Sequence, residues 1–482
     1  MTEILLIIPP FCYGDLSEAG PVYPSMGIVC VAATLEHAGY KVKIIDMFAE
    51  GYEESKLKSC LEDPELKIVG VSSVSATFKI SLNILKYAKE KRPDTTTIIG
   101  GPHITILPDE TMKETYIDYG VLGEGDNTAV ELADLIIKNK GSPENIKGLC
   151  FRKDRTLIKT EKRQFIENLD ELPFPAYHLL PMDKYRSYGV YDSGRKTTSM
   201  ITSRGCPFKC IYCCSSELFG GRWRPMSAEK TIEFIKKLYD EYGIRHIYFQ
   251  DDEFTVSHER AMKICDWIID KKIGLTWECL TRVSHVDNEL LSKMAKAGCK
   301  SILYGIETGY EEGLKQIKKG ITLEQAKNAV RLTKKNGMIA KVSFILGFPW
   351  ESKEEINKTI DFAIKLDADY SFFTILCPFP TTEVYEQIAK EGLFVPEFNM
   401  EMYSAMPAAD SLIRTKYLTS EEIVQMMGHA YKRLYFRPKY LLKRMLSLRH
   451  FSELKRNFKA GLSVLRFTVK SMGKKAKLAK TT

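Results

Sequence analysis

Short apolar runs alternate with helical stretches twice along this chain, and this alternation restricts the fold more than any other feature. The first series comprises ILLIIPP, KVKIID, KIVGVSS, TTIIGG and YGVLGEG, with helical patterns such as 27–37 and 80–89 between them. These runs are short and rich in Val and Ile, which is typical of strands buried in a parallel sheet between two layers of helices. We therefore predict an α/β protein that begins with a Rossmann-like domain over residues 1–145.

The second series occupies residues 196–390 and comprises TSMITS, HIYFQD, LTWECL, SILYGIET, KVSFILGF and YSFFTIL. Six such β/α units predict a partial (β/α)6 barrel, whose chemistry is expected at the carboxyl ends of its strands. The Pro-punctuated segment 146–195 lies between the two series and is predicted to be a linker. Residues 391–482 show no strand pattern and are predicted to form a helical, basic C-terminal region.

The chain has 482 residues and no apolar run of the length that a membrane-spanning helix needs. The first residues lack a basic flank and a cleavage site, so we expect a first strand there instead of a signal peptide, and a cytoplasmic protein. Twelve Cys in such a chain favour a reducing compartment, where clustered Cys more often bind metal than form disulfides.

Three cysteines, Cys206, Cys210 and Cys213, follow the first barrel strand in a C-x3-C-x2-C pattern. Soft thiolates on one short loop favour an iron-sulfur cluster or zinc. A closed tetrahedral zinc site needs four ligands, and Cys214 is a poor fourth because neighbouring residues on a loop point apart. The pattern predicts a 4Fe-4S cluster held by three Cys, with a structural zinc site as the alternative.

This loop, with Tyr212 before its last Cys, resembles the signature of radical S-adenosylmethionine enzymes. A 4Fe-4S cluster held by three Cys leaves one iron without a protein ligand, and the resemblance implies that this iron binds S-adenosylmethionine. It further implies that a one-electron donor such as flavodoxin or ferredoxin reduces the cluster, and that the cofactor is cleaved to a 5'-deoxyadenosyl radical. The catalytic residues on this view are Cys206, Cys210 and Cys213, and Tyr212 contributes to cofactor binding.

Other strand ends of the barrel fit the same resemblance. It implies that Asp251 and Asp252 contact the methionine amino group, that Glu307 binds the ribose hydroxyls, and that Gly347 lets the backbone approach the adenine. Each of these residues alone also fits a strand-end cap or a surface acid. Arg282 is expected either to bind a carboxylate or to form a structural salt bridge. Core packing is expected of Cys265, Cys279, Cys299 and Cys377.

The amino-terminal domain lacks Gly-x-Gly-x-x-Gly after its first strand, which argues against dinucleotide-dependent oxidoreductase chemistry. Its strand ends instead carry Ser72-Ser73, Gly100-Gly101 and Glu124 between two glycines. With the segment 22–27, this set resembles the cobalamin-binding domains that precede some radical S-adenosylmethionine barrels. The resemblance implies that the two glycines let the cobalamin nucleotide tail pass closely and that the serines hydrogen-bond it.

Classical cobalamin folds carry a His after the first strand that binds cobalt from below. No His occurs here between residues 1 and 36. We therefore expect cobalamin bound without a His lower ligand from that loop. His103 is either a near neighbour of cobalt or a residue that caps its own turn.

The carboxy-terminal tail is strongly basic, with sixteen Lys and Arg from residue 431 onward and a single acid, Glu453. Its apolar residues recur at helical spacing: Phe451, Leu454, Phe458, Leu462, Leu465 and Val469. A basic amphipathic helix of this kind predicts contact with an anionic membrane surface at the inner face, and docking on the barrel is the alternative. We expect no nucleic-acid binding, because the aromatic residues of the stripe would face the core.

Together these features predict an anaerobic, cobalamin-dependent radical S-adenosylmethionine enzyme. The resembling group contains C-methyltransferases and an oxidative cyclase, the anaerobic magnesium-protoporphyrin ester cyclase, so we expect C-methylation or cyclisation of an apolar or lipid-like substrate. A methylthiotransferase is the alternative, but its second cluster needs three amino-terminal cysteines, and only Cys12 lies in a strand-end loop while Cys30 and Cys60 fall in helical patterns. A cobalamin or redox sensor is a third reading, and it would not need the cysteine triad.

Overall fold

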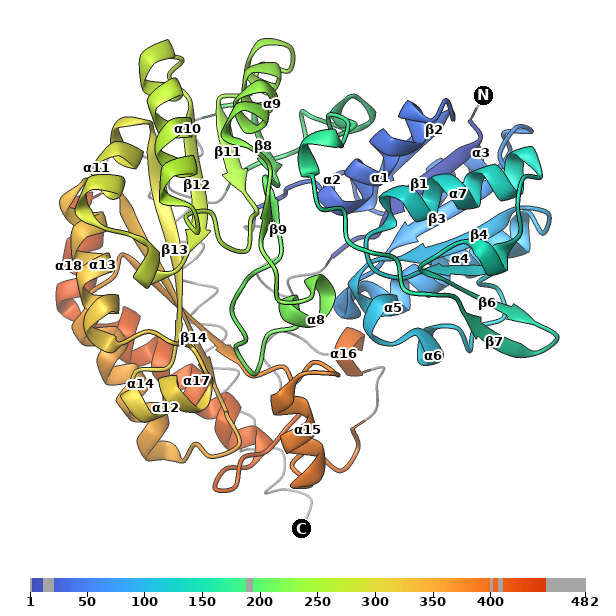
Figure 1. Ribbon diagram of the computed structural model, residues 1–482. Coiled ribbons are helices and arrows are strands. Elements are labelled where there is room, and N and C mark those ends of the chain that lie inside the picture. Colours follow the sequence, from blue (N-terminus) through green and yellow to red (C-terminus); the bar gives the residue numbers. More distant parts are fainter. Residues whose placement is uncertain (1, 12–20, 188–193, 399–401, 406–410, 448–482) are drawn as a thin grey trace.

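The computed structural model describes residues 2–11, 21–187, 194–398, 402–405 and 411–447, and these residues form two large sheets (Figure 1). The first has the strand order β2-β1-β3-β4-β5-β6-β7. Its parallel strands are β1 (Ile4–Ile8), β2 (Val42–Asp46), β3 (Ile68–Ser72), β4 (Thr96–Gly100) and β5 (Tyr119–Val121). This arrangement confirms the Rossmann-like fold expected from the first series of apolar runs.

The side chains of β1 alternate between the two faces of this sheet. Ile4, Leu6 and Ile8 pack in the core that includes α1 (Met26–His37) and Ala133 of α7 (Gly125–Lys138). Leu5 and Ile7 pack in a second core. That core includes residues of α3 (Glu54–Leu61) and α4 (Phe78–Lys91), and three short helices complete the domain: α2 (Met47–Glu50), α5 (Pro102–Ile106) and α6 (Pro108–Thr111). Both faces of the sheet are therefore buried, which explains its nearly continuous apolar strands.

Part of the segment expected to be a linker belongs to the first sheet. Strands β6 (Leu149–Lys153) and β7 (Thr156–Lys159) form an antiparallel hairpin that pairs with β5. Residues 160–187 cross toward the barrel and contain two short 3-10 turns, Leu169–Glu171 and Tyr177–Leu179.

The second sheet has six parallel strands in the order β15-β14-β13-β12-β11-β8, as expected for a partial barrel. These are β8 (Thr197–Met200), β11 (His246–Phe249), β12 (Thr276–Thr281), β13 (Cys299–Glu307), β14 (Ile339–Leu346) and β15 (Tyr370–Ile375). In Figure 1 the helices lie outside this curved sheet. They include α9 (Ala228–Asp240), α10 (His258–Lys271), α11 (Asn288–Lys296), α12 (Glu311–Gln316), α13 (Leu323–Lys335) and α14 (Lys353–Leu366).

The barrel helices begin at residues whose side chains cap them. Ser227 accepts a hydrogen bond from the backbone of Lys230, and Asp287 accepts one from Leu290. Thr322 and Ser352 form capping boxes with the residues three positions later. Such caps satisfy backbone donors that would otherwise lack a partner at a helix start. The caps therefore help to fix where each helix follows its strand.

The free edge of the barrel at β15 is covered by α17 (Ser420–Tyr435). The Tyr435 hydroxyl accepts a hydrogen bond from the Ser371 backbone at 3.2 Å and donates one to the same residue's carbonyl at 2.8 Å. Tyr431 makes the same pair of bonds to Phe373, at 3.2 and 3.0 Å. Two tyrosines one helical turn apart thus satisfy backbone groups that a seventh strand would otherwise pair.

Three further helices are α15 (Glu383–Lys390), α16 (Met402–Ala405) and α18 (Pro438–Ser447). Among the described residues, no helix has the length and apolar character to cross a membrane. The apolar stripe predicted for the tail, Phe451 to Val469, lies outside the described residues.

Candidate functional site

The cysteine loop lies between the two sheets. It follows the short strand β9 (Ser203–Arg204), which pairs with β10 (Arg224–Pro225), and it ends at α8 (Ser215–Phe219). Gly205 adopts a φ of +83°, and a Cβ there would lie 2.3 Å from the Arg222 carbonyl oxygen. Only glycine therefore allows the chain to turn from β9 into the cysteines. Figure 1 places β9 and α8 between the barrel and the first domain.

Cys206, Cys210 and Cys213 all lie on this loop. The backbone N–H of Cys213 donates to the Cys210 carbonyl at 3.1 Å. Burial raises the pKa of Cys206 and raises that of Cys213 to about 12, and the charge of Cys210 adds to both shifts. Thiols that are this reluctant to ionise need nearby positive charge, such as iron, to become thiolates.

Within the described ranges, no three His, Cys, Asp or Glu side chains converge closely enough to hold one metal ion. A closed zinc site needs four ligands, whereas a 4Fe-4S cluster can be held by three thiolates that leave one iron without a protein ligand. The donor set of three thiols on one partly buried loop therefore fits a 4Fe-4S cluster.

Tyr212 connects the cysteine loop to the end of β13. Its hydroxyl accepts a hydrogen bond from Lys319 at 3.0 Å, and Lys319 also forms an ion pair with Glu307 at 3.0 Å. Lys319 and Glu307 are both buried. A cation thus joins the predicted cluster loop to the residue predicted to bind ribose.

Glu307 has a strained backbone. Its φ is +75°, and the pairing between β13 and β14 shifts register between Gly305 and Glu307. Non-glycine residues rarely adopt a positive φ, and such strain concentrates at functional sites. The bulge re-aims this carboxylate at the end of its strand, where the sequence predicted a cofactor contact.

The acidic residues after β11 differ in their surroundings. Asp251 is buried, and its oxygens accept hydrogen bonds from the backbone and hydroxyl of Thr202 and from the hydroxyl of Ser203. It therefore holds the connection between β8 and β9. Asp252 accepts a hydrogen bond from Ser215 at 2.6 Å, lines a cavity, and lies close enough to raise the pKa of Cys206 and Cys213.

Gly347 begins the loop after β14 with a φ of +93°. Its backbone N–H and that of Phe348 donate to the buried carboxylate of Glu351, at 2.8 and 3.0 Å. Burial raises the pKa of Glu351 to about 7. A Cβ on Gly347 would lie 3.1 Å from Ile423 of α17. Sequence reasoning missed Glu351, although an acid four residues after a strand-end glycine is a detectable signal for a loop cap.

Arg282 follows β12, and its guanidinium carbon lies 3.7 Å from the centroid of the Phe208 ring on the cysteine loop. The residue is 5% exposed, and its Nε has no hydrogen-bond partner among the described residues. A buried guanidinium with an unsatisfied donor is costly unless an anion binds it. This observation favours the carboxylate-binding role over the structural salt bridge.

A cavity of about 580 Å³ lies between the first domain and the cysteine loop. Five residues predicted from the sequence line it: Ser72, Gly100, Gly101, Glu124 and Asp252. The lining also includes Arg204 and Gly205, immediately before Cys206. One cavity thus reaches the strand ends of the first sheet and the start of the cysteine loop.

The cavity extends as a slot along the first sheet. Its walls there are apolar residues of β1, β3 and β4 on one side and of α1 and α7 on the other, including Leu6, Gly70, Ile98, Val31 and Leu132. Ser73 does not line the cavity: it is fully buried, and its backbone N–H donates to the Gly100 carbonyl at 2.9 Å. The lining of this slot is apolar, which suits the flat base of a cobalamin nucleotide tail.

His103 stacks on Phe78, with ring centroids 3.8 Å apart, and its Nδ1 lies 3.1 Å from the Ser75 hydroxyl. Burial lowers its pKa to about 4, so it is neutral at physiological pH. It is not among the residues that line the cavity.

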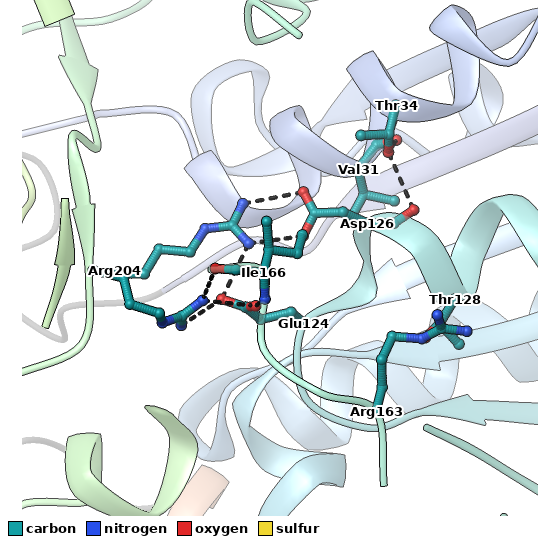
Figure 2. A network of polar contacts seen from close by, with 9 residues as sticks. Val31, Thr34, Glu124, Asp126, Thr128, Arg163, Ile166 and Arg204 are labelled. Atoms are coloured by element: carbon teal, nitrogen blue, oxygen red, sulfur yellow. Dashed lines mark hydrogen bonds and ion pairs between the residues drawn. The ribbon is translucent and has the colours of Figure 1, made fainter. Parts of the chain in front are cut away.

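Glu124 and Asp126 form ion pairs with Arg204 and Arg224 across the two domains. Figure 2 shows Glu124, Asp126 and Arg204 at this contact. Glu124 therefore lines the cavity, but its carboxylate is paired with Arg204 and Arg224. Cys265, Cys279 and Cys299 are buried in the barrel core, as expected, and Cys377 is partly buried and packs against that core.

Comparison with known proteins identifies both halves of the chain. The Radical SAM superfamily matches residues 200–363, and the B12 binding domain matches residues 14–133. An uncharacterized methyltransferase of Pyrococcus horikoshii is 37% identical over 92% of this chain and 94% of its own length. The cytidylyl-2-hydroxyethylphosphonate methyltransferase of Streptomyces wedmorensis is 29% identical, over 78% of this chain and 79% of its own.

Among solved structures, the fold resembles the cobalamin-dependent S-adenosylmethionine radical enzyme OxsB, solved with aqua-cobalamin and S-adenosylmethionine bound. The TM-score is 0.73 at 17% identity, over 98% of this chain and 72% of that one. The two matched domains confirm the cofactors expected from the sequence: a 4Fe-4S cluster, S-adenosylmethionine and cobalamin. The chain therefore belongs to the cobalamin-dependent radical S-adenosylmethionine enzymes.

Proposed function

We propose that this enzyme is a C-methyltransferase that acts at an unactivated carbon of a small molecule. The observation that carries this proposal is the single cavity shared by the strand ends of the first domain and the start of the cysteine loop. A methyl donor bound at one end of such a cavity faces the carbon activated at the other. The two relatives described above are both methyltransferases, which supports transfer over cyclisation.

Cobalamin would be held by the first domain. Ser72, Gly100 and Gly101 offer a hydroxyl and two side-chain-free backbone positions at the cavity wall. The apolar slot between the sheet and helices α1 and α7 would take the nucleotide tail. Ser73 would act indirectly, because it supports the Gly100 and Gly101 turn and does not reach the cavity.

The cluster would be held by Cys206, Cys210 and Cys213, and S-adenosylmethionine would bind beside it. Arg282 would bind the carboxylate of that cofactor, since its buried Nε lacks an acceptor. Glu307 would accept from the ribose hydroxyls while Lys319 and Tyr212 hold it in place. Asp252 lies near the cysteines and would accept from the amino group, and Asp251 would position the loop.

When bound, the cluster and S-adenosylmethionine supply a radical that removes a hydrogen atom, and cobalamin supplies the methyl group. The chain's own part is to exclude water, to orient the cofactors and to fix the distance between them. The Gly347 loop, held by Glu351 and covered by Ile423, would place backbone beside the adenine.

The methylthiotransferase alternative fits less well. Cys60 is buried in the core of α3 and α4, whereas Cys30 lines the cavity on the other face of the sheet. These two thiols therefore do not share a site, and Cys12 lies outside the described residues.

Three finer expectations are part of this proposal. The boundary of the cobalamin-binding domain is moved from 145 to about 160, because β6 and β7 extend its sheet; the barrel remains at 196–390 and the helical region at 391–482. The substrate is proposed to be apolar or lipid-like. The basic tail is proposed to contact an anionic membrane surface, on the charge of residues 431–482 alone.

Labelled methyl transfer tests this proposal. Protein reconstituted anaerobically with iron, sulfide and cobalamin would be incubated with S-adenosylmethionine carrying a trideuterated methyl group, a reductant and a metabolite extract. Methylation predicts a new product that carries all three deuterons. A product that loses hydrogen without gaining the label would show cyclisation, and a product that gains sulfur as well would show methylthiolation; either result would overturn the proposal.

A further inference from the structure

Four buried charges join the first domain to the paired strands β9 and β10, which flank the cysteine loop. Figure 2 shows three of them, Glu124, Asp126 and Arg204. Arg204 donates to the two carboxylate oxygens of Asp126 at 2.8 and 3.0 Å, and its Nη1 lies 3.2 Å from Glu124. Arg224 donates to both oxygens of Glu124 at 2.7 and 3.1 Å. The four side chains are between 3% and 13% exposed.

The local structure makes each charge depend on the others. Arg204 and Arg224 are direct cross-strand partners in the β9–β10 hairpin, a placement that is unfavourable for two like charges alone. Glu124 and Asp126 lie at the start of α7, where a helix favours acids. Two arginines from one domain and two acids from the other therefore form a group without net charge.

Arg204 and Asp126 both line the cavity. Asp126 belongs to the segment after β5, beside the predicted cobalamin site, and Arg204 is two residues before Cys206. The pair thus links the wall on which cobalamin would rest to the loop on which the cluster would form.

We propose that Arg204 and Asp126 are a positioning pair that sets the separation and orientation of the cobalamin site relative to the cluster. This inference rests on the proposed function. A planar guanidinium that meets a carboxylate through two bonds fixes an angle as well as a distance. Because the pair is buried, salt screens it little. A misplacement of about 1 Å in such a site can cost on the order of a hundredfold in rate, so the pair has a use beyond stability.

The chain offers a matched control close to the same strands, at Arg222 just before β10. Arg222 donates to both oxygens of Glu167 at 2.7 and 2.8 Å, but these side chains are 57% and 60% exposed. Glu167→Gln therefore removes a bidentate pair of the same geometry without touching the cavity. Asp126→Asn removes the negative charge of the buried pair and leaves Arg204 charged, and Arg204→Lys keeps the positive charge while it removes the planar fork.

The test measures the distance and orientation between the two cofactors, in the absence of any substrate. Wild type and the three variants would be loaded with both cofactors, and corrinoid and iron would be counted. The magnetic interaction between cob(II)alamin and the reduced cluster would then be recorded by electron paramagnetic resonance. We expect one defined interaction in wild type and in Glu167→Gln, and a shifted or broadened interaction in Asp126→Asn and Arg204→Lys at full cofactor content.

Unchanged interaction in both cavity variants would overturn the positioning role. Loss of corrinoid from both variants would also overturn it, since it would assign the pair to binding. A wild type that binds no corrinoid, by contrast, would refute the proposed function itself, so the two failures are distinguishable.

Discussion

The guanidinium of Arg282 rests on the Phe208 ring at 3.7 Å, so a buried cation contacts the loop that carries the three cysteines. Its Nε has no hydrogen-bond partner among the described residues. The aromatic contact compensates for part of the lost hydration, and a bound carboxylate would supply the missing acceptor.

Replacing Arg282 with Met should therefore weaken the binding of S-adenosylmethionine. A hydrogen bond to a charged group contributes about 1.5–3 kcal/mol, so the Kd should rise roughly tenfold to a hundredfold. Equilibrium dialysis of S-adenosylmethionine against reconstituted protein measures this Kd. Arg245→Met is the control: Arg245 also lies 3.7 Å from an aromatic ring, that of Tyr239, but it precedes the first residue of β11 at the opposite end of the strand. Equal Kd values for the two variants would remove Arg282 from the site.

We expect cobalamin to bind only when residue 100 has no side chain. A Cβ there would meet Val121 at an ordinary 3.8 Å, so a larger residue can be built without local strain but takes up space in the cavity. We expect Gly100→Leu to lose corrinoid absorbance while its iron content stays at the wild-type value. Lys86→Leu, on the exposed side of α4, serves as the surface control. Full corrinoid content in Gly100→Leu would place cobalamin elsewhere.

The stability of the barrel should depend on pH through Glu351. Its pKa is raised from 4.5 to about 7 by burial, so the folded state binds a proton that the unfolded state has released between these values. The contribution of Glu351 to the free energy of unfolding is therefore highest below pH 4.5, and it falls by up to about 3 kcal/mol as the pH rises to 7. In urea unfolding of the apoprotein, Glu351→Gln should flatten this part of the profile. A variant with the same pH slope as wild type would contradict the assignment.

The tyrosines on α17 should stabilise the edge of the barrel. Tyr431→Phe with Tyr435→Phe removes the hydroxyls that pair with β15 and keeps both rings. Each lost hydrogen bond costs about 1 kcal/mol, so the urea midpoint should fall clearly. Tyr417→Phe, at a residue 65% exposed, should leave the midpoint unchanged. No fall in the double variant would mean that water replaces the hydroxyls at no cost.

The strands were predictable from sequence because parallel sheets buried on both faces leave unbroken apolar runs. The hairpin of β6 and β7 was not. Its turn residues, Asp154 and Arg155, both adopt positive φ, at 48° and 69°, and neither is glycine. A two-residue hairpin turn with positive φ normally shows itself through Asn-Gly or Asp-Gly, and this signal is absent here. The segment therefore had the appearance of a charged linker.

The part of the site that lies on a single segment, Cys206, Cys210 and Cys213, could be predicted from the sequence. The contacts between distant segments could not be predicted. Arg204 and Asp126 are 78 residues apart, and neither position shows a pattern until the two domains are assembled. Likewise Asp251 had the position of a cofactor ligand, but its hydrogen bonds to Thr202 and Ser203 depend on how β8 and β11 pair.

The central claim is that Cys206, Cys210 and Cys213 hold the cluster that cleaves S-adenosylmethionine. Formation of 5'-deoxyadenosine by anaerobically reconstituted, reduced protein tests it most directly. Cys214→Ala is the matched control, because Cys214 is adjacent on the chain and is not an expected ligand. We predict 5'-deoxyadenosine from wild type and Cys214→Ala, and none from Cys206→Ala, Cys210→Ala or Cys213→Ala. Production by Cys213→Ala at the wild-type rate, or its loss in Cys214→Ala alone, would contradict the account.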